Sequence, residues 1–423
     1  MSRSHGVSSR FRSVLYAGGV RYLNAGADAP AARISRIGLG TWQFGSREWG
    51  YGSSYAGQEA HAIVRRALEL GVTLFDTAEV YGLGRSERIL GQALGEDRES
   101  AFLATKISFI NAMAEVCEAA GGDVQVLSRI LGADSRIGSA FLRPGLGFGG
   151  GCLPKDIRAF MARADELEAG QALGEDRDLA FLATKIFPVL PVAPVVEQRA
   201  VASANRLGVR RLDLYQVHQP NPLVRDGTIM RGMRALQRVG LVGEVGVSNY
   251  SLDRWRAAEA ALGDRVLSNQ VQYSLVARSP KRDLQPFAET TGHLVIAYSP
   301  LAQGLLSGRY HRGHRPANRV RSANPLFLPE NLERASELIA TLREVANAHS
   351  VTPAQIALAW AIHRPAVVAI PGASSLEQLE SNVAAADIDL TDGEYQALSA
   401  ASARFRPVTG PAALPRLVRA RFP

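Results

Sequence analysis

Residue types that can carry out acid–base chemistry stand at the ends of short apolar runs in this chain. The carboxylate, imidazole, hydroxyl, amide and phenol groups at these ends belong to Asp76, His218, Ser248, Asn249, Gln270 and Tyr298. The tripeptide ATK ends another such run and occurs twice, so Lys106 and Lys185 compete for one position. A carboxylate, an ammonium and an imidazole held together can bind and move protons.

Eight apolar runs, rich in branched residues, have the length and composition of buried strands. They span residues 33–40, 72–78, 101–107 or 180–186, 211–218, 243–249, 266–274, 294–300 and 366–372. Stretches between them place apolar residues at helical spacing, for example in residues 59–71, 195–208, 229–240 and 353–364. This alternation predicts the α/β class and a parallel (β/α)8 TIM barrel, in which chemistry belongs at the carboxyl ends of the strands.

A duplication decides where the lysine comes from. Residues 91–107 and 170–186 agree at fifteen of seventeen positions. The duplication gives the chain more residues than the barrel needs. If Lys106 occupied the third strand, this surplus chain would leave the barrel at the carboxyl face and cover the pocket. If Lys185 occupies the strand, the surplus chain leaves at the opposite face. Lys185 precedes His218 by 33 residues, the length of one strand, helix and strand, whereas Lys106 precedes it by 112. We therefore expect Lys185 in the barrel and a mainly helical insertion before the third strand.

Composition excludes several classes of protein. The chain has 423 residues, of which 46% are hydrophobic and 21% charged, so it can bury a large core. No run of apolar residues is long enough to cross a membrane.

The net charge of +8 lies in the two ends, since residues 1–24 and 404–423 hold nine arginines and no acid. We therefore expect no nucleic-acid partner, and a basic, disordered tail over residues 1–24 rather than a transit peptide. Two cysteines, Cys117 and Cys152, fit a reducing cytoplasm.

Eight motifs carry a family resemblance, in order along the chain. They are GLGTWQFG (38–45), FDTAEVYG (75–82), ATK, LYQVHQP (214–220), GVSNYS (246–251), NQVQYS (269–274), AYSPLAQGLLSGRY (297–310) and IPGASSLEQLESN (370–382). Together they resemble the aldo-keto reductase superfamily, and most of all its branch of potassium-channel β-subunits and bacterial broad-specificity reductases. The resemblance implies one barrel over residues 25–90 and 170–423. It also implies reduction of small aldehydes or ketones to alcohols with NADP(H).

The resemblance also implies a catalytic tetrad of Asp76, Tyr81, His218 and one lysine, taken as Lys185. Tyr81 would donate a proton to the developing alkoxide, although a free tyrosine, with a pKa near 10, is a poor donor at neutral pH. We expect the nearby ammonium to lower that pKa and Asp76 to keep the lysine charged. A neutral His218 would orient the substrate carbonyl.

The cofactor contacts implied by the family come from six places in the chain. They involve Gly40, Thr41, Trp42, Asp76, Ser248, Asn249, Gln270, Tyr298, Ser299, Leu301, Arg309, Gly372, Ser374, Gln378 and Asn382. Ser248, Asn249 and Gln270 would hold the nicotinamide carboxamide and Tyr298 would stack on its ring, while residues 298–309 would wrap the pyrophosphate. Further arginines, at positions 312, 315, 319 and 321, either clamp phosphates or form a solvated basic loop.

Residues 372–382 match the pattern GxSxxxQxxxN, which holds the adenosine 2′-phosphate and adenine in this branch. One departure is Ser381, where an acidic residue commonly precedes the final asparagine. NADP(H) is the expected cofactor, NAD(H) the alternative, and no metal is expected.

The surplus segment, residues 91–169, has a resemblance of its own. Residues 101–165 are similar to the middle of the UDP-glucose 6-dehydrogenase family, and Cys152, Lys155 and Asp156 match its nucleophile loop. That family's cysteine forms a thiohemiacetal with an aldehyde. Its dinucleotide-binding unit is missing here, and Glu96 and Ser100 stand where it places a lysine and an asparagine. Cys152 is therefore expected to be an idle thiol.

Two other functions remain open at this point. One is a regulatory subunit that binds a nicotinamide cofactor with little turnover. The other is an inactive fusion, since the insertion could expose apolar helix surface. The sequence does not indicate a particular substrate or oligomeric state.

Overall fold

The computed structural model describes residues 22–25, 32–44, 59–95, 126, 180–187, 189, 191–317, 319–413 and 415. Most of the expected tail and nearly all of the expected helical insertion lie outside these residues, as do Lys106, Cys117, Cys152, Lys155 and Asp156. Within the described part of the chain, no helix is both long and apolar enough to span a membrane.

Eight parallel strands form a closed barrel. In the order of their pairing they are β3 (Leu39–Gly40), β4 (Leu74–Asp76), β5 (Phe181–Ile186), β6 (Leu212–Val217), β7 (Val242–Ser248), β8 (Val266–Gln272), β9 (Leu294–Tyr298) and β10 (Val367–Ala369). Closure joins β3 to β10, because the Gly38 amide donates to the carbonyl of Ala369 at 2.8 Å and the Gly40 amide to that of Pro371 at 3.2 Å. A Cβ at Gly40 would lie 2.7 Å from the carbonyl oxygen of Ile370. The predicted (β/α)8 barrel is confirmed.

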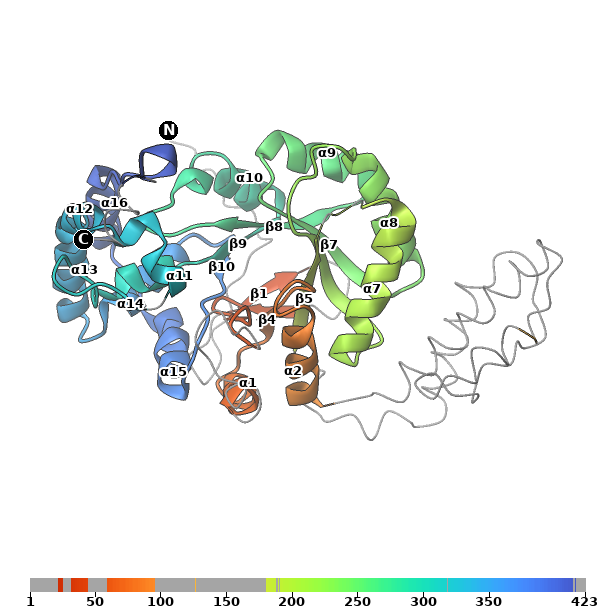
Figure 1. Cartoon of the computed structure of the whole chain (residues 1–423), viewed down its shortest axis with the longest axis horizontal. Coiled ribbons are helices and arrows are strands. Elements are labelled where there is room, and N and C mark those ends of the chain that lie inside the picture. The colour runs from red at the N-terminus through yellow and green to blue at the C-terminus, as the bar shows by residue number, and fades with distance from the viewer. Residues whose placement is uncertain are drawn as a thin grey trace, which may run out of the picture.

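Helices surround the strands, as Figure 1 shows. The helices of the ring are α1 (Ala60–Glu69), α2 (Arg85–Leu94), α7 (Ala193–Leu207), α8 (Asp226–Arg238), α9 (Leu252–Leu262), α10 (Leu284–Thr291), α14 (Pro353–Ala361) and α15 (Leu376–Ala384). Between β9 and α14 the chain adds α11 (Arg319–Ser322), α12 (Pro329–Arg334) and α13 (Ser336–Ala348), and α16 (Asp392–Arg404) follows the ring. Short 3-10 turns are η4 (Ser279–Lys281), η5 (Ala302–Ser307), η6 (Pro325–Phe327), η7 (Ala385–Asp387) and η8 (Gly410–Ala413).

Local sequence explains where two of these helices begin. Thr352 and Gln355 form a capping box at the start of α14, and Pro353 occupies its first turn. Thr391 and Glu394 form the same box at the start of α16. Both reciprocal caps satisfy backbone N–H groups that a helix start leaves without partners.

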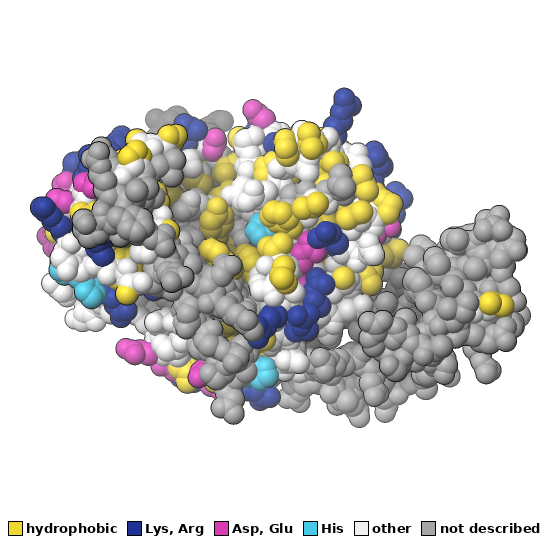
Figure 2. Space-filling model, viewed as in Figure 1, with side chains coloured by type: hydrophobic (Ala, Val, Ile, Leu, Met, Phe, Trp, Pro, Cys, Tyr) yellow, Lys and Arg dark blue, Asp and Glu magenta, His cyan; other side chains and the backbone are white. Residues whose placement is uncertain are grey.

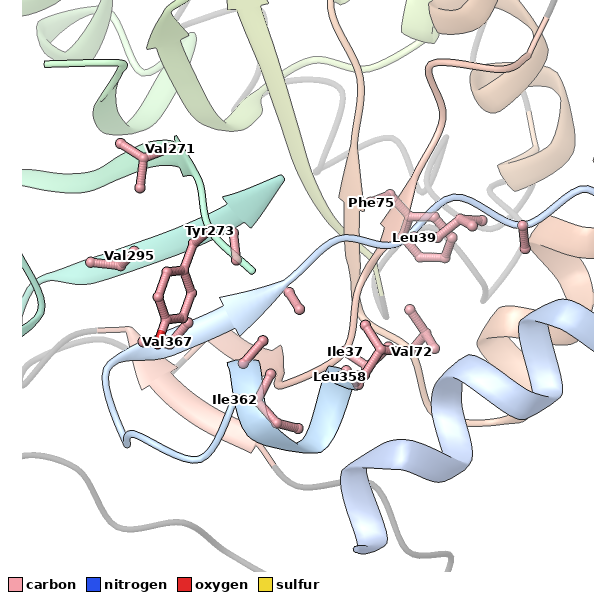
Figure 3. Packing of buried hydrophobic residues seen from close by; sticks show 14 of the residues in the cluster. Ile37, Leu39, Val72, Phe75, Val271, Tyr273, Val295, Leu358, Ile362 and Val367 are labelled. Atoms are coloured by element: carbon pink, nitrogen blue, oxygen red, sulfur yellow. The ribbon is translucent and has the colours of Figure 1, made fainter. Parts of the chain in front are cut away.

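The main core lies between the strands and the helix ring. Figure 3 shows part of it, where Val295 and Val367 from neighbouring strands lie close to Tyr273, and Leu358 and Ile362 of the α14 region face the barrel. All of these side chains are buried. Apolar residues on the outer face of each strand and the inner face of each helix therefore build one continuous layer.

A hairpin that the sequence did not predict fills one end of the barrel. β1 (Tyr22–Ala25) pairs antiparallel with β2 (Ala32–Ser35). Leu23 and Ile34 are each 1% exposed and join a second apolar cluster with inward-facing strand residues such as Leu74 and Phe181. These two residues begin β4 and β5, so the hairpin closes the amino end of the barrel.

This hairpin corrects two expectations. Residues 33–40 do not form one strand: they are divided between β2 and β3, and the side chain of Arg36 at the division donates to the carbonyls of Val367 and Arg364 at 3.0 and 2.8 Å. In addition, β1 begins inside the segment 1–24 that was expected to be a tail, because Leu23 is buried and the Tyr22 hydroxyl donates to the Gly71 carbonyl at 2.7 Å.

Both copies of the duplication contribute to the barrel. Residues 91–94, which open the first copy, complete α2, and residues 181–186, which end the second copy, form β5. The connection between α2 and β5 therefore joins β5 at its amino end, opposite the carboxyl ends of the strands.

Candidate active site

A buried ion pair lies at the carboxyl ends of β4 and β5. The Nζ of Lys185 lies 2.8 Å from Oδ1 and 2.7 Å from Oδ2 of Asp76, and Lys185 is fully buried. The alternation along β5 turns Lys185 inward while Thr184 faces α2, since Thr184 donates to Glu87 of that helix. Burial lowers the pKa of Lys185, and the Asp76 carboxylate opposes this effect.

Tyr81 stands on the turn that follows β4. Its ring centre lies 5.1 Å from the Nζ of Lys185 and 6.0 Å from the ring of His218, which meets it edge-on. The ring of Trp42, on the turn after β3, lies 6.3 Å away. Asp76, Tyr81, Lys185 and His218, separated by up to 142 residues in the sequence, thus meet in one place.

The expected lowering of the Tyr81 pKa is wrong. Burial raises the pKa of Tyr81 well above its ordinary value, and the negative charges of Asp76 and of an ionised Tyr298 add to the rise. The ammonium of Lys185 is neutralised by two contacts with Asp76, so it provides little net charge to stabilise a phenolate. Tyr81 therefore remains a phenol at neutral pH and has a proton to donate.

His218 follows β6 and is neutral at physiological pH. Burial, followed by the positive charge of Lys185, lowers the pKa of His218 to about 3. Phe187, which follows β5, packs edge-on against its ring at 5.9 Å. The Nδ1 atom is buried and has no hydrogen-bond partner among the described residues. An imidazole in this state can donate or accept a hydrogen bond but does not carry a charge.

Four residues expected to bind nicotinamide form a connected group across β7, β8 and β9. The Ser248 hydroxyl donates to the Gln270 carbonyl at 2.8 Å, and the Asn249 amide donates to Ser248 Oγ at 3.1 Å. The Tyr298 hydroxyl donates to Asn249 Oδ1 at 3.1 Å. Asn249 has a positive φ of 61°, a conformation that costs energy for a non-glycine residue and is frequent at functional sites.

The side chain of Gln270 does more than was expected. Its Nε2 donates to Oδ1 of Asp76 at 2.7 Å, so the carboxylate that binds Lys185 is also held by β8. The Asp76 carboxylate therefore accepts hydrogen bonds from Lys185 on β5 and from Gln270 on β8, and these bonds fix its orientation.

The segment from Gly40 to Trp42 contributes in three different ways. Gly40 allows the barrel to close, as described above. Thr41 is fully buried, and both its amide and its hydroxyl donate to the Asp76 carbonyl, at 2.9 and 3.0 Å. Its side chain therefore positions β4, and the expected contact of Thr41 with a cofactor stays a prediction. Trp42 is 45% exposed and lies at the edge of the site.

Strained backbone is concentrated after β9, in the segment expected to wrap a pyrophosphate. Ser299, Ala302 and Gln303 have φ values of 50°, 50° and 56°, and Gly304 has 96°. Leu301 accepts the amide of Gly304 at 2.9 Å. Successive residues of this kind turn backbone N–H groups toward one side, an arrangement that suits anions. Arg309 is exposed beside this turn.

The other arginines of this region differ from one another. Arg312 is exposed, whereas Nε of Arg315 donates to the Phe327 carbonyl at 3.0 Å and so holds η6. Arg321 also has interaction partners, and the side chain of residue 319 lies outside the description. Arg312 can therefore either bind a phosphate or belong to a solvated basic loop, whereas Arg315 stabilises the loop through its hydrogen bond to Phe327.

The residues expected to bind the adenosine phosphate lie together after β10. The amide and hydroxyl of Ser374 donate to Oε1 of Gln378 at 3.0 and 2.8 Å, and Nδ2 of Asn382 donates to the Gly372 carbonyl at 3.4 Å. A Cβ at Gly372 would lie 2.7 Å from Oε1 of Gln43, so this turn approaches the loop after β3 closely.

A buried glutamate behind the site was missed by the sequence analysis. Glu87 of α2 is fully buried, accepts from Thr184 Oγ1 at 2.7 Å and pairs with Arg206 of α7. Burial raises the pKa of Glu87, and Arg206 and Thr184 oppose the rise. The available signal was its place on the apolar face of α2, in line with Leu90 and Leu94.

Exposed apolar side chains lie on the loops that carry Tyr81 and His218. Leu83 and Leu223, on the loops after β4 and β6, are 88% and 90% exposed, and Trp42 and Phe187 are partly exposed. Figure 2 shows apolar side chains gathered where α7, α8 and α9 lie in Figure 1, beside a hollow. The described residues hold no group of three or more side chains suited to bind a metal.

Comparisons with known proteins place this geometry in a family. Residues 36–126 and 160–403 match the model of the aldo/keto reductase family, and residues 98–176 match that of the central domain of the UDP-glucose/GDP-mannose dehydrogenase family. Both suspected resemblances are thus confirmed.

Individual relatives agree with the family match. An uncharacterized oxidoreductase of Mycobacterium tuberculosis is 47% identical over 387 residues, covering 92% of this chain and 95% of that protein. A thermostable aldo-keto reductase solved with the inhibitor epalrestat has a TM-score of 0.60 and 25% identity, covering 90% of this chain and 99% of its own. A glycerol dehydrogenase of Gluconobacter oxydans, at 23% identity and a TM-score of 0.66, covering 93% of this chain and 98% of its own, shares the fold. The chain is therefore an oxidoreductase that belongs to the aldo/keto reductase family.

Proposed function

We propose that the protein is an NADP(H)-dependent carbonyl reductase in which Tyr81 is the proton donor. The observation that carries this proposal is the buried Lys185–Asp76 pair beside the Tyr81 ring, with a neutral His218 6.0 Å from the same ring. A proton donor, a group that orients a carbonyl and a fixed charge pair thus surround one position.

The residues at the strand ends fit a nicotinamide dinucleotide. Ser248 and Asn249 offer hydroxyl and amide groups beside Tyr298, and the turn at Ala302 and Gln303 has the positive φ angles of an anion-binding loop. Solved aldo-keto reductases from Klebsiella pneumoniae hold NADP or NADPH. When bound, NADPH supplies a hydride to the carbonyl carbon of the substrate.

The residues of this chain manage the accompanying proton. His218, being neutral, hydrogen-bonds the carbonyl oxygen and points it toward Tyr81. Tyr81 donates its hydroxyl proton to that oxygen as negative charge develops, giving the alcohol, and then takes a proton from solvent. The phenolate left behind is short-lived, because burial and the Asp76 charge favour its return to the phenol. Because burial raises the pKa of Tyr81, the phenol is the resting form, which favours reduction over alcohol oxidation at neutral pH.

The exposed side chains of Leu83 and Leu223, on the loops that carry Tyr81 and His218, favour substrates with an apolar body. We therefore propose small aromatic or aliphatic carbonyl compounds as substrates. With two cysteines in 423 residues, the chain also suits a reducing cytoplasm.

NADPH oxidation, followed at pH 7 with a panel of aromatic and aliphatic aldehydes and ketones, tests the proposal. We expect saturable turnover that falls at least about 100-fold in Tyr81→Phe, because only the proton donor is removed. Tyr395→Phe is the matched control, since its hydroxyl is buried on the outer layer, and it should keep wild-type rates. NADPH binding without turnover of any carbonyl compound would instead identify a regulatory subunit, and NADH preferred over NADPH would overturn the cofactor assignment.

A further inference from the structure

A second site with unusual charge lies on the outside of the barrel. It is an open cleft of about 640 Å³ between η4 and the segment that follows α16. Its lining includes Val276, Arg278, Lys281, Arg282, Phe405 and Arg406. None of these residues belongs to the candidate active site.

The cleft gathers four cationic side chains, and no carboxylate is among the described residues that line it. Asp283 contacts one of the four, since its Oδ2 is 4.0 Å from Nη2 of the well-exposed Arg282. Asp283 already caps α10, since its Oδ1 accepts the amide of Leu284 at 2.7 Å. One carboxylate beside Arg282 leaves the other three cationic side chains of the cleft without an acidic partner among the described residues.

Lys281 is held by neutral groups. Its Nζ lies 4.5 Å from the centre of the Tyr395 ring and 3.3 Å from Oγ of Ser399. An aromatic face stabilises an ammonium without cancelling its charge. The positive charge of Lys281 therefore remains available at the cleft.

Arg278 and Arg406 line the same cleft. Arg278 is half-buried, and its pKa is lowered by burial and by the positive charge of Arg406. No carboxylate among the described residues forms an ion pair with either guanidinium. Two guanidinium groups brought together without a counterion are stabilised by a ligand whose oxygens can accept from both, because each presents several N–H donors in a planar fork.

We propose that this cleft binds a small oxyanion with two or more negative charges, such as a phosphate-bearing or polycarboxylate metabolite, through Arg278 and Arg406. Lys281 and Arg282 add positive charge at its edge. Val276 and Phe405 form an apolar wall that suits the carbon part of such a ligand. The site is independent of the proposed reductase activity.

Calorimetric titration of the full chain tests this proposal, with pyrophosphate and citrate as probes and potassium chloride of matched ionic strength as the reference. The protein is first saturated with NADPH, so that the proposed cofactor site cannot contribute. We expect saturable binding of one pyrophosphate or citrate per chain, weakened at least tenfold in Arg278→Gln and in Arg406→Gln. Arg238→Gln, an exposed arginine in the last turn of α8, should bind as the wild type does.

The outcomes separate clearly. Binding of one probe but not the other identifies the anion as phosphate or carboxylate. Equal affinity in all variants, heats no larger than those of chloride, or binding that NADPH abolishes would each overturn the proposal. Because Arg406 is exposed, Arg406→Gln keeps the fold even if Arg278→Gln does not.

Discussion

At the scale of single residues, the site depends on how charge is neutralised. Lys185 and Asp76 form a fully buried pair, and Gln270 holds the same carboxylate from β8. A buried pair of this kind contributes little net stability, but removing one partner is costly because the other charge is left without compensation. Substitutions at this pair therefore need a variant that separates chemistry from folding.

Lys185→Met should reduce NADPH-dependent carbonyl reduction at least about 100-fold, while Lys106→Met should keep most of it. Lys185→Met also leaves Asp76 buried without its partner, at a cost of about 3–5 kcal/mol in the free energy of unfolding. The double variant Asp76→Asn/Lys185→Met removes both charges and should recover stability without recovering activity. Steady-state rates and denaturant unfolding check both points. The reverse ranking of Lys106 and Lys185 would refute the assignment of the lysine.

His218 makes stability depend on pH. Its pKa is about 3 in the folded protein and 6.5 in the unfolded chain, so between these values the unfolded state binds a proton that the folded state does not. Stability is therefore lost as pH falls through this window, by up to about 1.4 kcal/mol per pH unit. Urea unfolding at pH 7, 6, 5 and 4 should show this slope in the wild type and a shallower one in His218→Asn. Parallel curves for the two proteins would contradict the shifted pKa.

Sequence spacing favoured Lys185 over Lys106 for the third strand, and the structure places Lys185 there, beside Asp76 and Tyr81; the catalytic roles stay a prediction. Spacing was not enough for the electrostatics, because the effect of Lys185 on Tyr81 depends on how completely Asp76 neutralises the ammonium. Glu87 was missed for a related reason: a single charged residue on an apolar helix face does not reveal the threonine and arginine that satisfy it.

At the scale of elements, the strands of the barrel were predictable because each is a short apolar run ending in polar residues. The hairpin of β1 and β2 was not. Its apolar residues continue directly into β3, and the division at Arg36 depends on carbonyl partners more than 300 residues away. Long-range partners of this kind leave no local signal in the sequence.

The hairpin should contribute to stability but not to catalysis. Ile34→Ala removes a side chain that is 1% exposed from the amino end of the barrel and should cost about 2–5 kcal/mol of unfolding free energy. Because Lys185 lies at the other end of β5, the KM for aldehydes should change less than twofold. Val201→Ala, at an exposed position of α7, should cost less than about 0.5 kcal/mol. A loss of activity in folded Ile34→Ala protein would show that the hairpin also shapes the site.

At the scale of the whole molecule, the surplus chain joins the barrel at a position where a long insertion can be accommodated away from the candidate active site. It enters between α2 and β5, on the face opposite Lys185, and the two copies of the duplication supply the residues on either side. A long connection there adds only about 2 kcal/mol to the closing cost, because each doubling of a flexible loop costs about 0.6 kcal/mol.

Deletion of residues 91–169 should therefore give a folded, active enzyme. The residues that complete α2 are replaced by identical ones from the second copy, and the shorter connection should stabilise the protein by about 2 kcal/mol. Thermal unfolding and steady-state kinetics measure the effect. Loss of solubility or of activity on deletion would show that the segment supports the barrel.

A second deletion, of residues 108–186, provides a matched control. It yields nearly the same chain, differing at two positions, but its third strand comes from the first copy. In that variant Lys106→Met should abolish activity, although the same substitution leaves the full chain active. If it does not, the two copies are not interchangeable in the barrel.

The position of Trp42 has an optical consequence. Trp255 and Trp360 are fully buried in the outer layer, whereas the indole of Trp42 is 45% exposed and 6.3 Å from the Tyr81 ring. A reduced nicotinamide absorbs near the wavelengths at which tryptophan emits, so the fluorescence of Trp42 would be quenched by a dinucleotide bound beside it. The molecule therefore contains a built-in reporter of ligand occupancy, whose signal Trp42→Phe would remove.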